Sequence, residues 1–489
     1  MTLPYRPRFR LPPISRDLRR NLVLLACLAL FAVYGSFRQR YIWGVDSFGY
    51  YQLGKLFNEG RLHLPSPLPG FDQQALVPFG FTSDGTGQAT PDYPPGFPLL
   101  LALGHLVGAP RWVTPFLGVV SCFVLFTLLR ERVREGAAWL FTAAWAFMPL
   151  TVYGSTMMMS DLVAATAVMA GFLAFRRGYL AGAGWILGFS FAVRPTNVLF
   201  LLPLALLLRP DRRALRLGLH LALSCALYAT YNYCLYGAPW RTGYGNISDN
   251  LVASIFPSHF AFYATTSVVL LSPLVIGLAA CGLAPWNREK LSLLVWPLTL
   301  MVFYSFWLGG GIDRWWWARF ILPGYWALFL LAADGFENLL RWAARRAGER
   351  VAPVAGGLLM LALLVLPCYY IRYGRARGDV WVRGTGQPNF EVVGRVGAFA
   401  PPGSLVGSVE LCSSFTLYSE LVPFLPIKNH APALIEQALA AGRHVYLLPE
   451  PWNASNPVVA EIERRFRIRE IARYNFIWEG LPVYEVSAR

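Results

Sequence analysis

The sequence contains the apolar run Asn21-Leu-Val-Leu-Leu-Ala-Cys-Leu-Ala-Leu-Phe-Ala-Val-Tyr-Gly-Ser-Phe37, which is followed by Arg38, Arg40 and Asp46. An apolar run of this length predicts a helix that crosses a membrane. Because it lacks a small-residue cleavage site and leads into arginines, we interpret it as a retained first span and not as a cleaved signal. The carboxylate of Asp46 is then expected just beyond the first crossing.

The rest of the chain repeats this pattern of apolar blocks. Of its 489 residues, 55% are hydrophobic and only 14% are charged, whereas soluble domains carry about 25% charged residues. We therefore predict an α-helical polytopic membrane protein with about eleven transmembrane helices. The predicted spans are residues 21–37, 112–130, 137–153, 157–175, 179–193, 195–208, 214–236, 261–283, 291–308, 318–340 and 353–373.

The formal net charge of +16 comes largely from short arginine clusters between these blocks. Clusters of this kind mark cytoplasmic loops, whereas nucleic-acid binding needs a basic patch on one face of a folded domain. We expect no nucleic-acid partner. The clusters place the N-terminus in the cytoplasm, and an odd number of spans then places the C-terminal part outside. They lie at residues 6–20, 130–134, 176–177, 209–216 and 341–350.

The predicted organisation has three parts. Residues 1–20 form a basic cytoplasmic segment, residues 21–378 a transmembrane domain with a large outside loop at 38–111, and residues 379–489 a soluble extracytoplasmic domain. This last part is predicted to be a small α/β domain because short apolar runs alternate with helical stretches. The apolar runs are residues 404–409 and 444–448, and the helical stretches are residues 432–441 and 457–466.

Residues 93–107 form a further apolar segment, which begins Tyr93-Pro-Pro-Gly-Phe-Pro. As a span it would place every later arginine cluster outside. Prolines are tolerated at the start of a helix, where their missing N–H groups cost nothing. We therefore interpret this segment as a helix that lies along the outer interface.

Two acids are candidates for chemistry. Asp46 either caps the amphipathic helix that follows it or acts as a general base that takes a proton from a hydroxyl group. Asp161 follows Thr156-Met-Met-Met-Ser160 at the mouth of a span. It either caps that span or serves a function, since an acid at this depth is costly.

Basic and aromatic residues supply the other candidates. Arg194 lies in a long apolar stretch and needs a partner, either an anionic phosphate at the broken helix Arg194–Pro195 or an acid such as Asp161. In Asp313-Arg314-Trp-Trp-Trp-Ala-Arg319, the tryptophans fit either an interfacial belt or a platform for a sugar ring, with Arg314 or Arg319 on a phosphate.

No group of His, Cys and Asp residues has metal-ligand spacing. The sequence therefore indicates no cofactor and no metal ligand, and it leaves a divalent metal open.

In this order, the motifs resemble those of the GT-C superfamily of membrane glycosyltransferases, and most of all the branch with the protein O-mannosyltransferases and the lipid A aminoarabinose transferase. The similarity covers about residues 21–340. It rests on four features: Asp46 with the aromatic-containing helix after it, the Tyr-Pro-Pro segment at 93–103, Asp161, and Arg-Phe-Ile-Leu-Pro at 319–323.

The resemblance implies a hexosyl- or pentosyltransferase of the plasma (inner) membrane. Such an enzyme takes a sugar from a polyprenyl-phosphate carrier and passes it, with inversion, to a lipid, glycan or protein acceptor outside the cell. Asp46 is then expected to be the base, and Asp161 to position the acceptor or the base. Arg194 is expected near the lipid phosphate. Tyr50, Asp92, Tyr93, Arg314 and Arg319 complete the predicted substrate-binding residues.

The chain departs from the family pattern at two positions. The acidic pair that commonly follows the first span is Asp46-Ser47 in this chain, and the basic residue after the fifth span is Arg194, where lysine is frequent.

Two other function classes stay open. One is a transporter or flippase of a lipid-linked glycan, which needs broken helices in two corresponding halves. The other is a non-catalytic membrane protein with the same fold.

Overall fold

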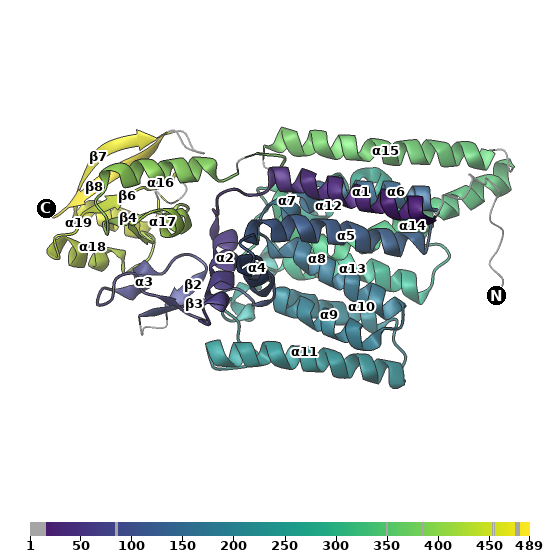
Figure 1. Ribbon diagram of the computed structural model, residues 1–489, viewed down its shortest axis with the longest axis horizontal. Helices are drawn as coiled ribbons and strands as arrows, with labels where there is room; N and C mark the ends of the chain where they lie inside the picture. Colours follow the sequence, from purple (N-terminus) through teal and green to yellow (C-terminus); the bar gives the residue numbers. More distant parts are fainter. Residues whose placement is uncertain are drawn as a thin grey trace.

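The computed structural model describes residues 16–83, 87–348, 351–378, 380–383, 385–451, 453, 455–474 and 480–489. Residues 1–15 of the predicted basic N-terminal segment lie outside this set. Most of the described chain is a bundle of roughly parallel helices, and a small α/β domain lies beyond one end of it (Figure 1). The helices of the bundle are α1 Arg16–Phe37, α5 Val113–Arg130, α6 Glu135–Phe147, α7 Pro149–Thr156, α8 Ser160–Arg176, α9 Leu180–Val193, α10 Leu201–Ala205, α11 Arg212–Tyr236, α12 Phe256–Gly282, α13 Arg288–Ser305, α14 Leu322–Ala347 and α15 Val351–Arg377.

Helix α14 lies in the core of the bundle. Its large side chains Tyr325, Trp326 and Phe329 are fully buried. It crosses α12 at a pair of glycines, where a Cβ on Gly335 would lie 1.8 Å from the carbonyl oxygen of Leu278 and one on Gly282 would lie 1.9 Å from that of Leu331. Small residues at a crossing allow two membrane helices to approach closely, and these two glycines are required for this contact.

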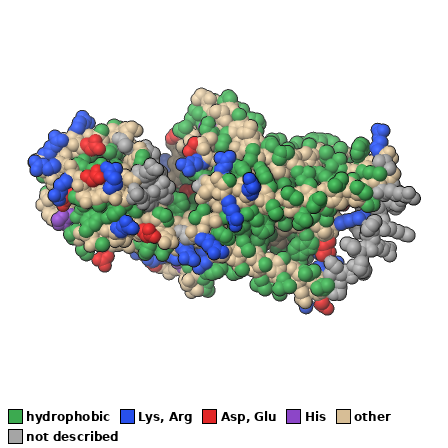
Figure 2. Space-filling view, turned by 90° about the horizontal axis from the view of Figure 1, so that it is seen from above, with side chains coloured by type: hydrophobic (Ala, Val, Ile, Leu, Met, Phe, Trp, Pro, Cys, Tyr) green, Lys and Arg blue, Asp and Glu red, His purple; other side chains and the backbone are tan. Residues whose placement is uncertain are grey.

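On the face shown in Figure 2, the surface of the bundle is largely hydrophobic, whereas many charged side chains lie over the small domain. By length and composition, five described helices are apolar enough to span a membrane, or six if the bent pair α6 and α7 counts as one. The other predicted spans are shorter, as in α9 and α10, or begin with charged residues, as in α11 and α13. The predicted number of about eleven spans therefore stays a prediction.

The first long loop forms a compact cap on one end of the bundle. Helices α2 and α4 lie against each other at its base. At about 1.5 Å per residue, the 11 residues of α4 are too short to cross a bilayer core of about 30 Å. Its outward side chains Leu99, Leu103 and Leu106 are exposed, as expected of a helix in an interface. The elements are α2 Val45–Asn58, β1 Leu64–Pro65, α3 Gln73–Leu76, β2 Phe81–Ser83, β3 Gln88–Pro91, α4 Gly96–Leu106 and the 3₁₀ helix η1 Pro110–Trp112.

The C-terminal domain is a five-stranded sheet of order β5-β4-β6-β8-β7 with four helices. Strand β4 is parallel to β5 and β6, and β8 is antiparallel to β6 and β7. The predicted α/β pattern is confirmed, because both predicted apolar runs contain strands and both predicted helical stretches are helices. The elements are α16 Gln387–Phe399, β4 Leu405–Gly407, α17 Cys412–Tyr418, β5 Val422–Phe424, α18 Ala431–Ala440, β6 Val445–Leu447, α19 Pro457–Arg465, β7 Arg467–Tyr474 and β8 Leu481–Ser487.

The cap and the C-terminal domain share a hydrophobic core. Leu68 and Leu76 of the first loop pack with Phe424 of the edge strand β5. The backbone N–H of Leu425 donates a hydrogen bond of 2.9 Å to the carbonyl oxygen of Ala75. This contact, which joins residues about 350 positions apart in the chain, fixes the C-terminal domain over the end of the bundle where Asp46 lies.

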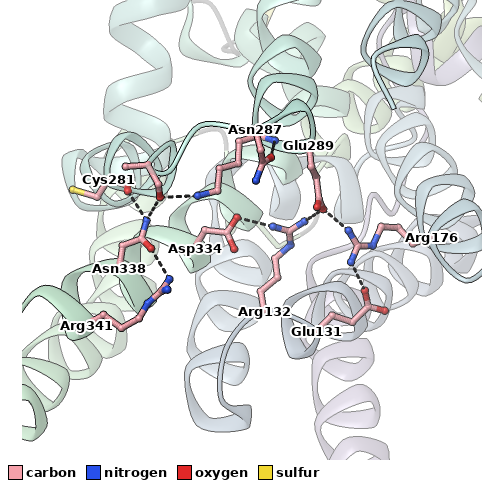
Figure 3. Close-up of polar contacts among 11 residues, drawn as sticks. Glu131, Arg132, Arg176, Cys281, Asn287, Glu289, Asp334, Asn338 and Arg341 are labelled. Atoms are coloured by element: carbon pink, nitrogen blue, oxygen red, sulfur yellow. Dashed lines mark hydrogen bonds and ion pairs between the residues drawn. The ribbon is translucent and has the colours of Figure 1, made fainter. Parts of the chain in front are cut away.

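The opposite end of the bundle is held by ion pairs (Figure 3). Arg132 lies between Asp334 of α14, at 2.6 Å, and Glu289 of α13. Arg176, at the end of α8, pairs with the same Glu289 and, at 3.4 Å, with Glu131. Two of the predicted cytoplasmic arginine clusters, 130–134 and 176–177, therefore meet at one end of the molecule.

Arg132→Ala is expected to destabilise the bundle, because Asp334 and Glu289 would lose a cation whose side chain is only 10% exposed. The loss should be at most about 3 kcal/mol, since both carboxylates are partly hydrated. Apparent melting temperature in detergent measures it. Arg130→Ala is the matched control, because Arg130 is exposed and its ion pair with Glu135 is long, at 4.0 Å. Equal melting temperatures for the two variants would contradict the assigned role of Arg132.

Candidate active site

Asp46 lies in the first turn of α2, next to the bundle. The helix is capped by Gly44, in a positive-φ conformation (φ 77°), without a side-chain cap bond, so the alternative in which Asp46 caps this helix is wrong. Its carboxylate instead accepts hydrogen bonds from the Tyr93 hydroxyl at 2.9 Å and from Arg319 at 2.7 Å. The Asp46 side chain is 32% exposed, so a substrate can reach it.

Two tyrosines from the first loop support this carboxylate. Gly49 allows Tyr93 to approach, because a Cβ at that position would lie 2.0 Å from the Tyr93 ring. Tyr50 lies with its ring 4.5 Å from that of Tyr93 and hydrogen-bonds with Ser160 at 2.8 Å. Burial raises the pKa of Tyr50 to about 12, and burial followed by the charge of Asp46 raises the pKa of Tyr93. Both phenols therefore stay protonated, and Tyr93 acts as a donor to Asp46.

Asp161 is the second acid of the site, and it is buried. Helix α8 begins at Ser160 and its cap residue is Met159, so the alternative of Asp161 as a cap is wrong too. One Asp161 oxygen accepts from Arg194 and the other lies 3.6 Å from Arg319. With a side chain only 4% exposed, Asp161 holds the two arginines and is not itself accessible to a substrate.

Arg194 ends α9, where Pro195 begins the 3₁₀ helix η2 Pro195–Phe200. Besides its pair with Asp161, it donates to the Tyr304 hydroxyl at 3.1 Å, and that hydroxyl hydrogen-bonds with Thr196 at 2.9 Å. Its guanidinium also lies 4.8 Å from the centre of the Phe320 ring. Of the two partners considered for Arg194, the structure contains the acid.

Arg319 joins the two acids. It lies in the 3₁₀ helix η5 Trp315–Ile321 and is 8% exposed. Its guanidinium contacts Asp46 and Asp161 and lies over the rings of Trp316 and Trp317. Two carboxylates and two guanidinium groups thus form one alternating chain, Asp46–Arg319–Asp161–Arg194.

The structure brings six of the eight predicted site residues together in this network and leaves two outside it. Arg314 is exposed and pairs with the neighbouring Asp313 at 3.7 Å. The Asp92 carboxylate accepts from Thr82 at 2.6 Å and is not one of the four ions of the network. Sequence reasoning missed Tyr304, Thr196 and the functional position of Ser160, because hydroxyl side chains in or beside apolar segments carry no signal of the direction in which they point.

An apolar groove of about 530 Å³ lies between the base of the cap and helices α9 and α11. Its lining includes Pro95 and Ala192, which lie two positions along the chain from Tyr93 and Arg194 respectively. It is lined among others by Phe57, Leu99, Trp185, Phe189, Leu227 and Tyr231. Within the described residues, no group of three or more His, Cys, Asp or Glu side chains is placed to hold a metal ion.

Comparisons with solved structures place this arrangement among known folds. The chain is similar to ArnT from Cupriavidus metallidurans, solved bound to undecaprenyl phosphate, with 13% identity, a TM-score of 0.59, and coverage of 96% of this chain and 98% of that one. It is also similar to the oligosaccharyltransferase of Archaeoglobus fulgidus, solved with a tethered acceptor peptide. The identity is 11%, the TM-score is 0.58, and the match covers 96% of this chain and 74% of that one.

A third similar structure is the arabinofuranosyltransferase AftD from Mycobacteria, with 14% identity, a TM-score of 0.53, and coverage of 98% of this chain and 40% of that one. This chain has the GT-C fold. No protein-family model and no curated protein matches its sequence. The fold expected from the motif order is therefore confirmed, and in this GT-C chain Asp46 occupies the end of the bundle that the first loop covers.

Asp92 makes the stability of the cap depend on pH. Burial raises the pKa of this carboxyl to about 6, opposed by the Thr82 hydrogen bond and the charge of Lys428. The folded chain therefore binds this proton more tightly than the unfolded chain, and the stabilisation present below pH 3.8 is lost as the pH rises through about 6. Asp92→Asn should thus gain melting temperature relative to wild type between about pH 4 and pH 7. A difference that stays constant over this range would contradict the burial effect.

Proposed function

We propose that this chain is a glycosyltransferase that moves a sugar from a polyprenyl-phosphate-linked donor to an acceptor hydroxyl on the extracytoplasmic side, with inversion. The observation that carries the proposal is the partly exposed carboxylate of Asp46, held by Tyr93 and Arg319 at the covered end of a GT-C fold. A carboxylate with fixed orientation and one accessible side is suited to general-base catalysis.

The proposed step is a direct displacement. The acceptor oxygen forms a bond to the anomeric carbon, the bond from that carbon to the phosphate oxygen breaks, and its electron pair leaves with the lipid phosphate. The hydroxyl proton passes to Asp46. Arg194 and Arg319 are the fixed positive charges that stabilise the anionic leaving group, while Asp161 positions both of them.

The apolar groove supports a donor on a lipid carrier. It lies between the base of the cap and helices α9 and α11, and its walls are almost entirely hydrocarbon and aromatic. Because Pro95 and Ala192 of the lining are close in sequence to Tyr93 and Arg194, we infer that a prenyl chain in this groove directs its phosphate toward the arginines. In the similar ArnT structure the bound molecule is undecaprenyl phosphate, which is a carrier of the proposed class.

The orientation follows from the distribution of charge. The end of the bundle opposite to Asp46 holds the arginine-containing loops of Arg132 and Arg176, and such loops remain in the cytoplasm. We therefore propose a cytoplasmic N-terminus in the inner membrane. Asp46, the cap and residues 379–489 lie outside in this orientation.

Asp46→Asn is expected to lower sugar transfer by at least about 100-fold, because the variant lacks the base but keeps an oxygen that accepts from Tyr93. Transfer is measured with purified protein and polyprenyl-phosphate sugars. Asp249→Asn is the control, since Asp249 is an exposed aspartate outside the network that accepts a hydrogen bond from its neighbour Ser248, and its replacement should leave transfer unchanged. Near-normal turnover of the folded Asp46 variant would remove Asp46 as the base.

Leu227→Trp is expected to narrow the groove and to raise the KM for a long-chain donor about tenfold, through steric exclusion of roughly one prenyl unit. A donor shortened to one or two prenyl units should be affected less. Leu219→Trp is the matched control, because Leu219 is an exposed residue two turns away on α11 outside the groove lining. Equal effects on long and short donors would contradict the groove assignment.

The alternative functions are outcomes of the same assays. Reconstituted vesicles that translocate a lipid-linked glycan without any sugar transfer would favour a transporter. Absence of both activities, with the lipid still bound, would favour a non-catalytic protein of this fold.

A further inference from the structure

Trp316 and Trp317 form a pair of rings beside Asp46. Their centroids are 4.3 Å apart, and the Arg319 guanidinium lies 5.1 Å from the first and 5.4 Å from the second. The same guanidinium donates to Asp46 at 2.7 Å. Both rings are partly exposed. The pair, the cation and the accessible carboxylate therefore occupy one small area.

An interfacial belt does not account for this arrangement. Trp315 is buried and its ring lies 6.1 Å from that of Tyr153, so it does not face lipid. Trp317 donates from its indole nitrogen to Asp313 at 3.0 Å, which fixes the orientation of the ring. By contrast, Trp240 is 80% exposed, as a side chain in a membrane interface would be.

We propose that Trp316 and Trp317 form the acceptor subsite and that the acceptor is a carbohydrate, a proposal that rests on the function proposed above. The C–H face of a sugar ring carries partial positive charge and is attracted to the negative face of an indole. Hydroxyl groups at the edge of a ring stacked there lie within reach of the Asp46 carboxylate.

The polar side chains at the rim of the subsite favour a sugar over a hydrocarbon alcohol. Asp313 and Arg314 are exposed at the edge of the pair, where they can bind the remaining hydroxyls of a ring. A hydrocarbon alcohol would gain nothing from these charges. The sugar hydroxyl attacks the anomeric carbon of the donor, its proton goes to Asp46, and the phosphate departs toward Arg194.

The test measures binding of methyl glycosides to the full chain in nanodiscs by saturation-transfer NMR, with a serine-containing tripeptide and glycerol as non-carbohydrate hydroxyl compounds. Wild type should bind at least one of the pyranosides or furanosides and neither of the other compounds. Trp316→Ala and Trp317→Ala should each weaken binding about tenfold, which corresponds to ~1.4 kcal/mol, the size of one aromatic contact. Trp316→Phe, which keeps a ring, should lose less.

Two further variants keep the outcomes distinguishable. Trp240→Ala is the matched control, because it removes an exposed tryptophan of an outside loop and should leave binding unchanged. Asp46→Asn should abolish transfer and retain glycoside binding, so loss of transfer alone does not touch the subsite. Undiminished glycoside binding by the folded alanine variants, or preferential binding of the tripeptide, would overturn the proposal even if the chain proves to be a transferase.

The acceptor glycoside can be attached to a lipid or be soluble, and both forms contain the sugar ring that the two tryptophans would contact. The wild-type affinities for a lipid-linked glycoside in the nanodisc and for its soluble head group distinguish these two sources, because a lipid-borne acceptor should bind more tightly with its lipid attached. Trp316→Ala should weaken the binding of both ligands by the same factor, and so should Trp317→Ala, because the rings contact only the sugar.

Discussion

The contact of Arg319 with two carboxylates is the interaction on which the rest of the site depends. A buried cation or carboxylate on its own costs several kcal/mol at membrane depth, and it persists only when it is paired. Arg319 joins Asp46 of the first loop to Asp161 of α8, and Asp161 in turn holds Arg194 at the end of α9. The ion chain therefore fixes four separate segments of sequence relative to one another.

The exposure of the two carboxylates decides their roles within the ion chain. The side chain of Asp161 is 4% exposed and that of Asp46 is 32% exposed, so only Asp46 can meet a substrate. Two glycines help to position Asp46. Gly44 allows the backbone turn into α2, and Gly49 allows Tyr93 to lie close. The cap shares a core with the C-terminal domain, and this packing helps to keep the Asp46 carboxylate in place without a substrate.

Much of this site could be predicted because a charge next to an apolar run is conspicuous, as with Asp46, Asp161 and Arg194. Arg314 and Arg319 lie five residues apart in one motif, and nothing in their sequence distinguishes the buried residue from the exposed one. The contribution of Tyr304 depends on the rotation of α13, which its uniformly apolar surroundings do not reveal. The contact of Ala75 with Leu425 joins distant parts of the chain, and no local pattern encodes it.

The first loop lacks the second acid of the family pattern, and the charges of the ion chain balance without it. Ser47, which stands at that position, is fully buried and donates to the carbonyl oxygen of Met158. Two carboxylates already balance two guanidinium groups, so a further acid at this depth would leave an unpaired charge, which is costly. An anionic phosphate that enters this neutral site must therefore draw the arginines away from their carboxylates. Arg319 shares its charge with Asp46, so in the proposed reaction the arrival of the donor weakens the contact of Arg319 with Asp46. Donor binding is then linked to the release of the proposed base.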